Sequence, residues 1–424
     1  MALAQSGHTV TKVNFNGGDR VYWRSHSGLK TTRTLACRVD EVALPAFYRD
    51  VLTDTGATDV VVFGDCRPVH QPAIALAKQA GLRVHVFEEG YFRPDWVTLE
   101  RGGANGHSRL PADPNWYSQI AQDWTDKQKT TSPLVPVGAS MVPRIWHDVR
   151  YNSANLLNPL FYPRYQSHVP HAITAEYAAY VARFARVQRR KRKDDAAIGR
   201  LTNGLLNPSA NQSANPSKEG HLPRYFLVPL QIPGDAQLTF HSHYGETQTF
   251  IADVMRSFVD FAPDDALLVF KNHPLDPGLK RHDRLVARLA RQWGCAERVR
   301  FLETGHLPTL LNHAAGLVAV NSTTIGQALF HRCPTIALGK SLFALPGLTF
   351  QGGLDAFWRQ ARQPDMGLFK AFHKVVLHTT QINGGFYNRH GISLCVAHAL
   401  DRLLAPESPL ERLLAEYPPK VSPP

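Results

Sequence analysis

The sequence predicts an α/β protein with two doubly wound, Rossmann-like domains, and three observations support this fold class. Short runs rich in Val, Ile, Leu and Phe alternate with stretches of helical periodicity, as expected for parallel strands connected by helices. The alternation occurs in two separate blocks of the chain. The length of 424 residues corresponds to two or three domains at about 150 residues each.

The strands and the helix of the first block follow from composition. Residues 60–63 (Val-Val-Val-Phe) are apolar throughout, as in a buried parallel strand. A helix over 73–80 is expected to end at Gly81, because glycine readily adopts the left-handed conformation that terminates helices. Residues 83–87 form the next expected strand, and residues 9–15 an earlier one.

The second block contains five expected strands separated by helices. These strands cover residues 225–230, 267–271, 299–302, 317–320 and 335–338. We assign the block to a domain over residues 222–385. Residues 386–424 contain a short expected helix at 410–417, and we expect this segment to pack back on the N-terminal domain.

A basic amphipathic helix is expected between the blocks. Residues 173–187 carry apolar side chains at helical spacing and lead into five basic residues, 189–193. Such a helix would hold the protein on an anionic membrane; the alternative is a solvated helix whose apolar side is core. The basic residues that share its flanking face are Arg183, Arg186, Arg190 and Lys193.

A polar stretch at 207–217 is rich in Asn, Ser and Pro and cannot bury a core. We therefore expect a linker over residues 201–221. It follows an N-terminal domain that spans residues 1–200.

Charge and composition narrow the class of partner. Lys and Arg number 47 and Asp and Glu 35, which gives a formal net charge of +12 and favours an anionic partner. No nucleic-acid-binding motif accompanies the charge, so we expect no nucleic-acid partner. No apolar run is long enough for a membrane helix, and the N-terminus does not resemble a signal peptide. We expect a cytoplasmic protein whose five scattered cysteines are reduced.

Polar residues follow several expected strands, where ligands bind in open α/β sheets because loops and helix N-termini meet there. In the first domain they are Asp65 and the pair Glu88 and Glu89. In the second domain they are Gln231, Asp235, Asn272, His273, Pro274, Asn321, Ser322, Thr323 and Thr324. This pattern predicts a ligand site in each domain.

Each of these groups also has a purely structural explanation. The hydroxyls of residues 322–324 suit a helix cap as well as a phosphate, and His273 beside a proline suits a turn. Asp235 follows Pro-Gly and suits a turn cap. Glu88 and Glu89 suit a solvated pair, although adjacent carboxylates repel each other and raise one pKa, as a general acid or base requires.

Several common enzyme classes lack support. The sequence contains no phosphate-binding Gly-x-x-x-x-Gly-Lys-Ser/Thr loop, no Gly-x-Gly-x-x-Gly after a strand and no Gly-x-Ser-x-Gly elbow. It also has no His, Asp and Glu cluster at metal-ligand spacing. Strand-end hydroxyls, a histidine and carboxylates fit a glycosyltransferase that uses a nucleotide sugar without a metal cofactor.

Three short motifs are similar to those of bacterial sialyltransferases, which use CMP-activated 2-keto sugars: Glu-Glu-Gly at 88–90, His-Pro at 273–274 and Ser-Thr at 322–323. Longer segments resemble capsular polysaccharide proteins of the KpsS/LipB type, which are β-Kdo transferases. These segments are residues 63–68, 86–96, 98–100, 105–111 and 231–237. The resemblance covers roughly residues 7–389 and implies a GT-B fold, with two Rossmann-like domains facing across a cleft.

The resemblance implies transfer of β-Kdo from CMP-Kdo to lysophosphatidylglycerol, which starts the glycolipid linker of a bacterial capsule. The implied catalytic residues are Asp235 as nucleophile and Glu88 or Glu89 as acid/base. The implied donor-binding residues are Lys271, His273, Pro274, Asn321, Ser322, Thr323 and Thr324. Further residues of the implied cleft are Asp65, Arg67, Tyr91, Arg93, Asn105, Gln231 and Gln237.

The chemistry of this donor agrees with the expected absence of a metal cofactor. CMP-Kdo has a single phosphate, so an imidazolium and a few hydroxyl or N–H donors suffice to stabilise departing CMP. Transfer with retention needs a nucleophile and an acid/base, and each domain offers one. The expected partners are a lipid acceptor at the inner membrane and the capsule biosynthesis and export machinery, with the protein lying peripherally on the cytoplasmic face.

Relative to the family pattern, the chain starts inside the helix that precedes the strand at 9–15, so we expect the first strand of the N-terminal sheet to be missing. A rival function is a non-catalytic capsule assembly or export component that serves as a docking platform. The joint presence of Glu88, Glu89, Asp235 and His273 favours the enzyme, because a platform does not need them.

Overall fold

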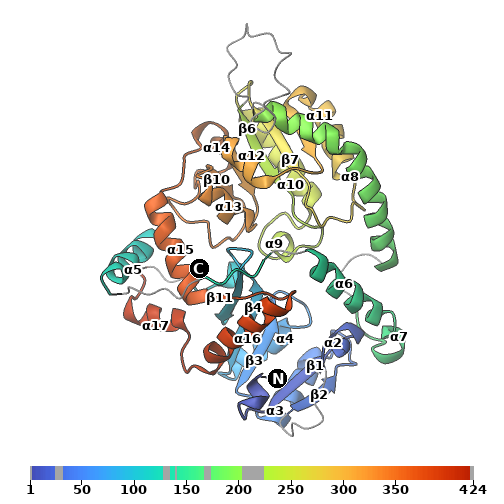
Figure 1. The fold of residues 1–424 in the computed structure, drawn as a ribbon, viewed down its shortest axis with the longest axis vertical. Helices are drawn as coiled ribbons and strands as arrows, with labels where there is room; N and C mark the ends of the chain where they lie inside the picture. The colour runs from blue at the N-terminus through green and yellow to red at the C-terminus, as the bar shows by residue number, and fades with distance from the viewer. Residues whose placement is uncertain are drawn as a thin grey trace. The chain divides into compact units, whose positions relative to one another are not determined.

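The structure is a computed structural model that describes residues 2–23, 32–127, 134–138, 141–166, 173–202 and 224–420. Its contacts divide the chain into two compact units, whose helices and strands are labelled in Figure 1. Unit 1 comprises Met1–Pro111, Gln119–His168 and His373–Pro424. Unit 2 comprises Ala112–Ser118 and Val169–Phe372.

Unit 1 contains two sheets in the described part of the chain. The first is a parallel pair, β1 (Val10–Asn14) and β2 (Thr32–Ala36). The second has the order β11-β5-β4-β3, with β3 and β4 parallel and β5 and β11 joined by antiparallel pairing. Its strands are β3 (Asp59–Phe63), β4 (Arg83–Glu89), β5 (Trp96–Arg101) and β11 (Gln381–Asn383).

Strands were expected at β1 and β3, but none at β2, β5 or β11. The strand expected at β4 ended too early, because Glu88 and Glu89 belong to the strand and pair with β5. The chain reverses after β4 at Gly90, where an added Cβ would lie 2.1 Å from the Trp96 carbonyl oxygen. This tight reversal makes the four-stranded sheet mixed rather than parallel throughout.

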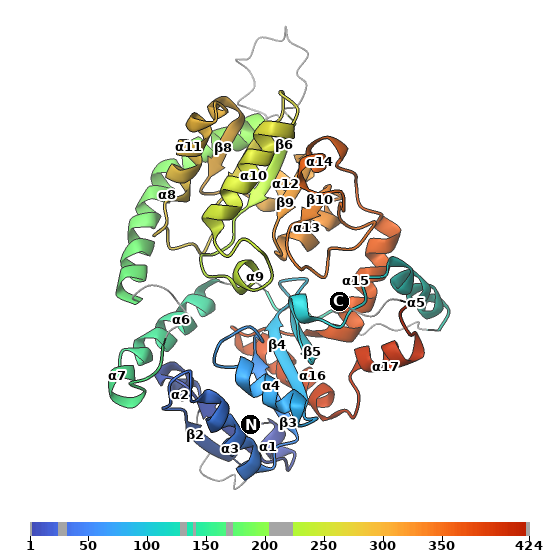
Figure 2. The same cartoon turned by 180° about the vertical axis from the view of Figure 1, so that it is seen from behind.

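Helices cover both faces of the four-stranded sheet (Figures 1 and 2). On one face α4 (Gln71–Gln79) packs Ile74 and Ala77 against the valines of β3 and β4. On the other face α16 (Arg389–Leu404) packs Cys395 and Ala399 against β5 and β11. Other helices of this unit are α1 (Ala2–Gln5), α2 (Gly17–Tyr22), α3 (Leu44–Thr55), α6 (Met141–Asn155), α7 (Asn158–Phe161) and α17 (Pro409–Glu416).

Among its described residues, unit 2 contains one sheet of five parallel strands in the order β10-β9-β6-β7-β8. The strands are β6 (Tyr225–Pro229), β7 (Leu267–Lys271), β8 (Val299–Leu302), β9 (Gly316–Ala319) and β10 (Thr335–Ala337). All five were expected from their apolar runs. The predicted α/β class with two Rossmann-like units is therefore confirmed.

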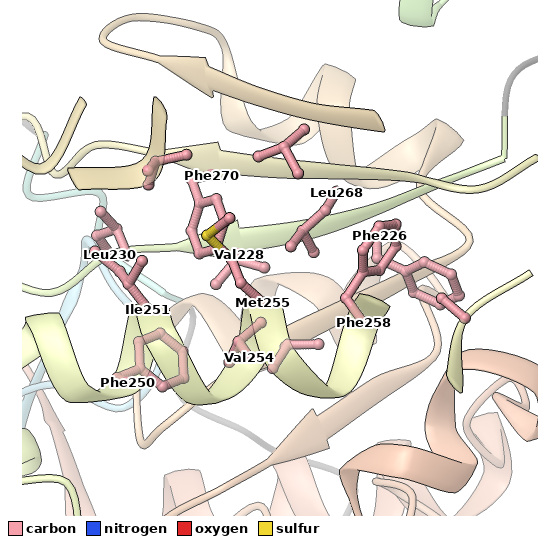
Figure 3. Packing of buried hydrophobic residues seen from close by; sticks show 14 of the residues in the cluster. Phe226, Val228, Leu230, Phe250, Ile251, Val254, Met255, Phe258, Leu268 and Phe270 are labelled. Atoms are coloured by element: carbon pink, nitrogen blue, oxygen red, sulfur yellow. The ribbon is translucent and has the colours of Figure 1, made fainter. Parts of the chain in front are cut away.

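The core of unit 2 explains why its strands are so readily recognised. Figure 3 shows α10 (Thr247–Phe261) packing Phe250, Val254 and Phe258 against side chains of β6 and β7. All five residues of β6 are buried, because helices cover both faces of a parallel sheet. Other helices of the unit are α8 (Ile173–Leu201), α9 (Ala236–Thr239), α11 (His282–Gln292), α12 (Leu307–His313), α13 (Thr324–Phe330) and α14 (Leu354–Gln360).

The two units do not follow the predicted domain boundaries. Helix α8 belongs to unit 2 rather than to the N-terminal domain, since buried Arg183 and Asp194 bond to loops after β7 and β8. Unit 1 resumes at His373, within α15 (Met366–Thr380), and α5 (Pro114–Lys127) also crosses a division. The predicted linker lies largely outside the described residues, which end at 202 and resume at 224.

The predicted membrane face of α8 needs correction. Arg183 is buried against carbonyl oxygens of unit 2, and Arg190 forms a 3.0 Å ion pair with Asp283. Two of the four basic residues predicted to face a membrane thus bond to other residues of unit 2. None of the described helices is long and apolar enough to cross a bilayer.

Candidate active site

The carboxyl end of the unit 2 sheet gathers the residues predicted to bind the donor. Because its strands are all parallel, their carboxyl ends lie on one edge. β6 lies between β9 and β7, so Asp235 after β6 is flanked by the Asn321 loop and the His273 loop. The topology therefore places three predicted motifs on neighbouring strands.

Asp235 lies at the start of α9, in a turn built around Gly234, whose φ is +81°. Its Oδ1 accepts a 2.9 Å hydrogen bond from the Gln237 backbone N–H. Its Oδ2 lies 3.5 Å from Gln231 Nε2, while the buried Gln231 Oε1 has no hydrogen-bond partner in the described structure. The capping geometry considered as the structural alternative is thus present, and it leaves Oδ2 directed to a side-chain donor.

The loop after β9 is tied to the Asp235 turn. Asn321 Nδ2 donates to Gln237 Oε1 at 2.6 Å and to the Lys340 carbonyl at 2.7 Å. Ser322 Oγ accepts from the Thr324 backbone N–H at 3.2 Å, whereas the Thr323 side chain makes no cap bond. Ser322 therefore caps the first turn of α13, as the structural alternative predicts.

The His-Pro turn after β7 is braced from α8. Arg183 donates to the His273 carbonyl at 2.9 Å and to the Pro274 carbonyl at 2.7 Å. Its Nε lies 3.4 Å from Glu303, which also accepts from Asn272 at 3.0 Å. The brace fixes the backbone that carries the histidine.

The ring of His273 has a defined hydrogen-bonding role. Its Nδ1 accepts a 3.0 Å hydrogen bond from the Leu275 N–H, so in this geometry the ring proton lies on Nε2. An imidazolium was expected at this position; with Nδ1 accepting, the ring donates through Nε2 instead. Nearby Lys271 is buried, and burial lowers the pKa of its ammonium group.

In unit 1, the residues after β3 form a compact turn. Gly64, with φ of +73°, donates its N–H to the Phe87 carbonyl at 2.8 Å. Asp65 is buried and accepts from the Ala104 N–H at 3.0 Å and from His107 Nδ1 at 3.1 Å. Arg67 stacks over the Phe63 ring at 5.3 Å.

Glu88 and Glu89 point to opposite faces of the sheet, because successive residues of a strand alternate. Glu88 shares the α4 face with Val86, and Glu89 shares the α16 face with Phe87. Burial raises the pKa of Glu88, and the charge of Glu89 is a smaller contribution. The expected rise in one pKa is present, with repulsion from Glu89 as one of its causes, but burial is the larger cause because the strand places the two carboxylates on opposite faces.

Glu89 is surrounded by cationic and hydroxyl groups. Tyr387 donates its hydroxyl to Glu89 Oε1 at 2.7 Å. Arg144 lies 3.6 Å from the same oxygen, and Arg93 lies 3.7 Å from Oε2. Arg144 also stacks over the Tyr387 ring at 4.8 Å.

Tyr91 connects the Glu-Glu-Gly motif to the Asn105 loop. Its hydroxyl donates to Glu100 Oε1 at 2.5 Å and accepts from the Asn105 N–H at 2.6 Å. Glu100 also accepts from Ser108 Oγ at 2.5 Å, and burial raises the pKa of this carboxyl to about 7. Asn105 itself has a φ of +55°, which is unusual for a residue other than glycine.

Four residues of these networks were given no site role from the sequence: Arg144, Arg183, Tyr387 and Glu100. Three of them lie far in the chain from the groups that they bond, so no local pattern indicates them. Glu100 ends one of the segments that carry the family resemblance, which was the available signal.

The chain matches the family described as "Capsule polysaccharide biosynthesis protein" over residues 58–387. It belongs to this family. It is 34% identical over 385 residues to the "Capsule polysaccharide export protein KpsS" of Escherichia coli, covering 91% of this chain and 92% of that protein. It is 31% identical to the "Capsule polysaccharide modification protein LipB" of Neisseria meningitidis serogroup B, covering 91% of this chain and 87% of that protein. The predicted resemblance to this type is confirmed.

Among solved structures, the chain is similar to the β-Kdo 2,7 transferase of Thermosulfurimonas dismutans KpsC. The TM-score is 0.41 at 13% identity, covering 93% of this chain and 99% of that chain. The calicheamicin glycosyltransferase CalG4 gives a TM-score of 0.29 at 14% identity, covering 99% of this chain and 94% of that chain.

Proposed function

We propose that the protein is a retaining glycosyltransferase that transfers β-Kdo from CMP-Kdo to a lysophospholipid, lysophosphatidylglycerol. This reaction would start the glycolipid linker of a capsular polysaccharide. The observation that supports it most is the edge of the unit 2 sheet, where Asp235 lies between the His273 and Asn321 loops. Membership of the capsule biosynthesis family supports the pathway.

Unit 2 would bind the donor and supply the nucleophile. The Nε2–H of His273, together with donors of the Ser322 and Thr323 loop, suits a monophosphate, and we propose that no metal takes part. Hydrogen-bond donors that are already in position stabilise the charge that develops on departing CMP. Arg183 and Asn321 are positioning residues in this proposal, because they hold the loops rather than the donor.

Asp235 would attack the anomeric carbon of Kdo. The bond from that carbon to the CMP phosphate oxygen breaks as the Asp235 Oδ2 bond forms, and CMP leaves with the bonding electrons. The sugar's own carboxylate repels the nucleophile, and a neighbouring hydrogen-bond donor such as Gln231 Nε2 would offset this repulsion. The acceptor hydroxyl then gives its proton to the acid/base as its oxygen displaces Asp235, which leaves as a free carboxylate. This second displacement restores the original anomeric configuration.

Unit 1 would supply the acid/base, and its two glutamates differ in suitability. Glu88 is partly buried, and burial raises the pKa of its carboxyl, which favours a group that can hold a proton and pass it on. Glu89 is engaged with Tyr387, Arg93 and Arg144. We therefore assign Glu88 as acid/base and Glu89 as its positioning neighbour, in the GT-B arrangement that the family resemblance implies.

The test uses the purified chain with CMP-Kdo and a fluorescent lysophosphatidylglycerol. We expect acceptor-dependent release of CMP and a product heavier by one Kdo residue. In Glu88→Gln, which slows proton transfer, an enzyme adduct of Kdo mass should appear on the peptide that contains Asp235. Asp235→Asn should abolish both the adduct and the product. An adduct on another residue would exclude Asp235 as nucleophile. Wild-type protein that neither binds CMP-Kdo nor releases CMP would favour the docking platform instead.

A further inference from the structure

Within unit 1, helix α6 packs against α2 and the preceding Asn16 through polar side chains. Tyr151 Oη accepts from Asn16 Nδ2 at 2.7 Å, and Asn155 Oδ1 accepts from the Gly18 N–H at 2.9 Å. His147 Nδ1 lies 2.7 Å from the Tyr22 hydroxyl. The glycine allows close approach, since a Cβ at Gly18 would lie 2.4 Å from the Tyr151 ring. The inner face of this helix is thus a hydrogen-bonded one.

The opposite face of α6 is apolar and exposed. Along α6 its residues recur at helical spacing, and α7 continues the surface. The exposed side chains are Val142 (74%), Ile145 (54%), Trp146 (64%), Val149 (37%), Leu156 (63%), Leu157 (53%), Leu160 (77%) and Phe161 (39%). We call this set the α6–α7 apolar surface. At 1.5 Å per residue its α6 part, from Val142 to Val149, extends over about 10 Å.

This arrangement reverses the usual pattern, in which a helix of a folded domain buries its apolar stripe. Contrast α10, which buries Phe250, Val254 and Phe258 (Figure 3). Scattered exposed apolar residues are ordinary, but a contiguous stripe marks a surface that contacts something apolar.

The charges around the stripe indicate what covers it. Arg20 stacks over Phe161 at 5.3 Å, Arg150 stacks over Tyr22 at 5.0 Å, and Arg164 is exposed just beyond α7. Asp148 is the one acidic residue in the sequence of α6 and α7. A stripe with an exposed Trp and basic flanks has the composition of a helix lying in a bilayer interface.

We propose that the α6–α7 apolar surface lies in the interface of a membrane that contains anionic lipid. The apolar side chains would enter the boundary between headgroups and acyl chains, and the arginines would contact lipid phosphates. This surface differs from the one expected on α8, where two of the predicted membrane-facing arginines are committed within unit 2.

The same helix also reaches the candidate site. Arg144, on the inner side of α6, contacts Glu89 and stacks on Tyr387. Docking of α6 on a membrane would therefore place the Glu89 side of unit 1 close to lipid headgroups, where a lysophospholipid acceptor resides. This second step rests on the proposed function, whereas membrane contact does not.

The experiment compares co-sedimentation of full-length variants with vesicles of phosphatidylethanolamine and phosphatidylglycerol, without CMP-Kdo. The test variant is Ile145→Glu/Val149→Glu, and the matched control is Val181→Glu/Phe184→Glu, two exposed apolar residues of α8. We expect about tenfold or greater loss of binding in the test variant only, and weaker wild-type binding to phosphatidylcholine vesicles. Equal binding by wild type and test variant, or loss only in the α8 variant, would overturn the proposal.

Two further measurements exclude other causes. Both variants should unfold at the wild-type temperature, and vesicles should shift wild-type tryptophan emission to shorter wavelength but not that of Trp146→Phe. A wild-type dimer that the test variant dissociates, without vesicle binding by either, would assign the surface to a second copy and overturn the proposal. Transfer to a detergent-dispersed lysolipid is assayed separately, so a failure of the chemistry and a failure of membrane contact are distinguishable.

Discussion

The two sheet edges that carry the candidate site residues are held in place by different means. In unit 2, Asp235, His273 and Ser322 each bond to a backbone N–H two residues further along the chain. In unit 1, Glu89 is held by Tyr387 and Arg144, from distant parts of the sequence. The turns of the first edge form by local bonds, to which Arg183 and Asn321 add long-range ones, whereas the second edge exists only once unit 1 has folded.

The largest expected effect tests the difference between the two unit 1 glutamates. Glu88→Gln should lower kcat by about 10²- to 10⁴-fold, because the acid/base is removed. Glu89→Gln keeps the side-chain shape and should lower kcat by about tenfold, through looser positioning. CMP release measured under saturating donor and acceptor checks both. Equal losses of kcat in the two variants would contradict the assignment of Glu88 as acid/base and Glu89 as positioning residue.

Arg183 tests whether the unit 2 edge depends on local turns alone. Arg183→Met leaves buried Glu303 without its cation. Removing one partner of a buried ion pair costs about 3–5 kcal/mol of unfolding free energy. Denaturant unfolding of the full chain should show this loss, whereas exposed Arg189→Met should remain close to wild type. A small loss of unfolding free energy in Arg183→Met would mean that the local bonds of the His-Pro turn are sufficient to stabilise it.

The same difference explains what the sequence could predict. The strands of unit 2 are mostly apolar, and β6, β7 and β9 are followed by polar motifs whose turn bonds are local. Asp235, His273 and Ser322 could therefore be found from local pattern. Their capping bonds were foreseen as alternatives for the same reason.

The unit 1 network could not be predicted in this way. β5 and β11 pair antiparallel across a separation of nearly three hundred residues, and no local signal marks Tyr387 or Arg144 as partners of Glu89. Alternation along β4 does place Glu88 and Glu89 on opposite faces, but only once both are known to belong to the strand. The polar inner face of α6 packs against Gly17 and Gly18, which are also far from it in the sequence.

Glu100 gives a pH-dependent test of unit 1. Burial raises its pKa from 4.5 to about 7, so between these values the folded state holds a proton that the unfolded state has lost. Folding stability therefore falls as pH rises from about 4.5 to about 7, by about 3 kcal/mol for this group. Glu100→Gln should abolish that fall in denaturant unfolding, whereas exposed Glu407→Gln should not. Parallel pH profiles for all three proteins would contradict the assignment.

The smallest expected effect concerns Asn105, which combines local strain with a distant partner. Its φ of +55° is tolerated by asparagine and glycine but costs other residues about 1 kcal/mol. Asn105→Ala should therefore lower the free energy of unfolding by about 1 kcal/mol, and Asn105→Gly should stay within about 0.5 kcal/mol of wild type. Both retain the backbone N–H that donates to Tyr91, so neither removes that bond. If glycine destabilises as much as alanine, the Asn105 side chain rather than its backbone conformation stabilises the loop, and unit 1 relies on yet another side-chain contact.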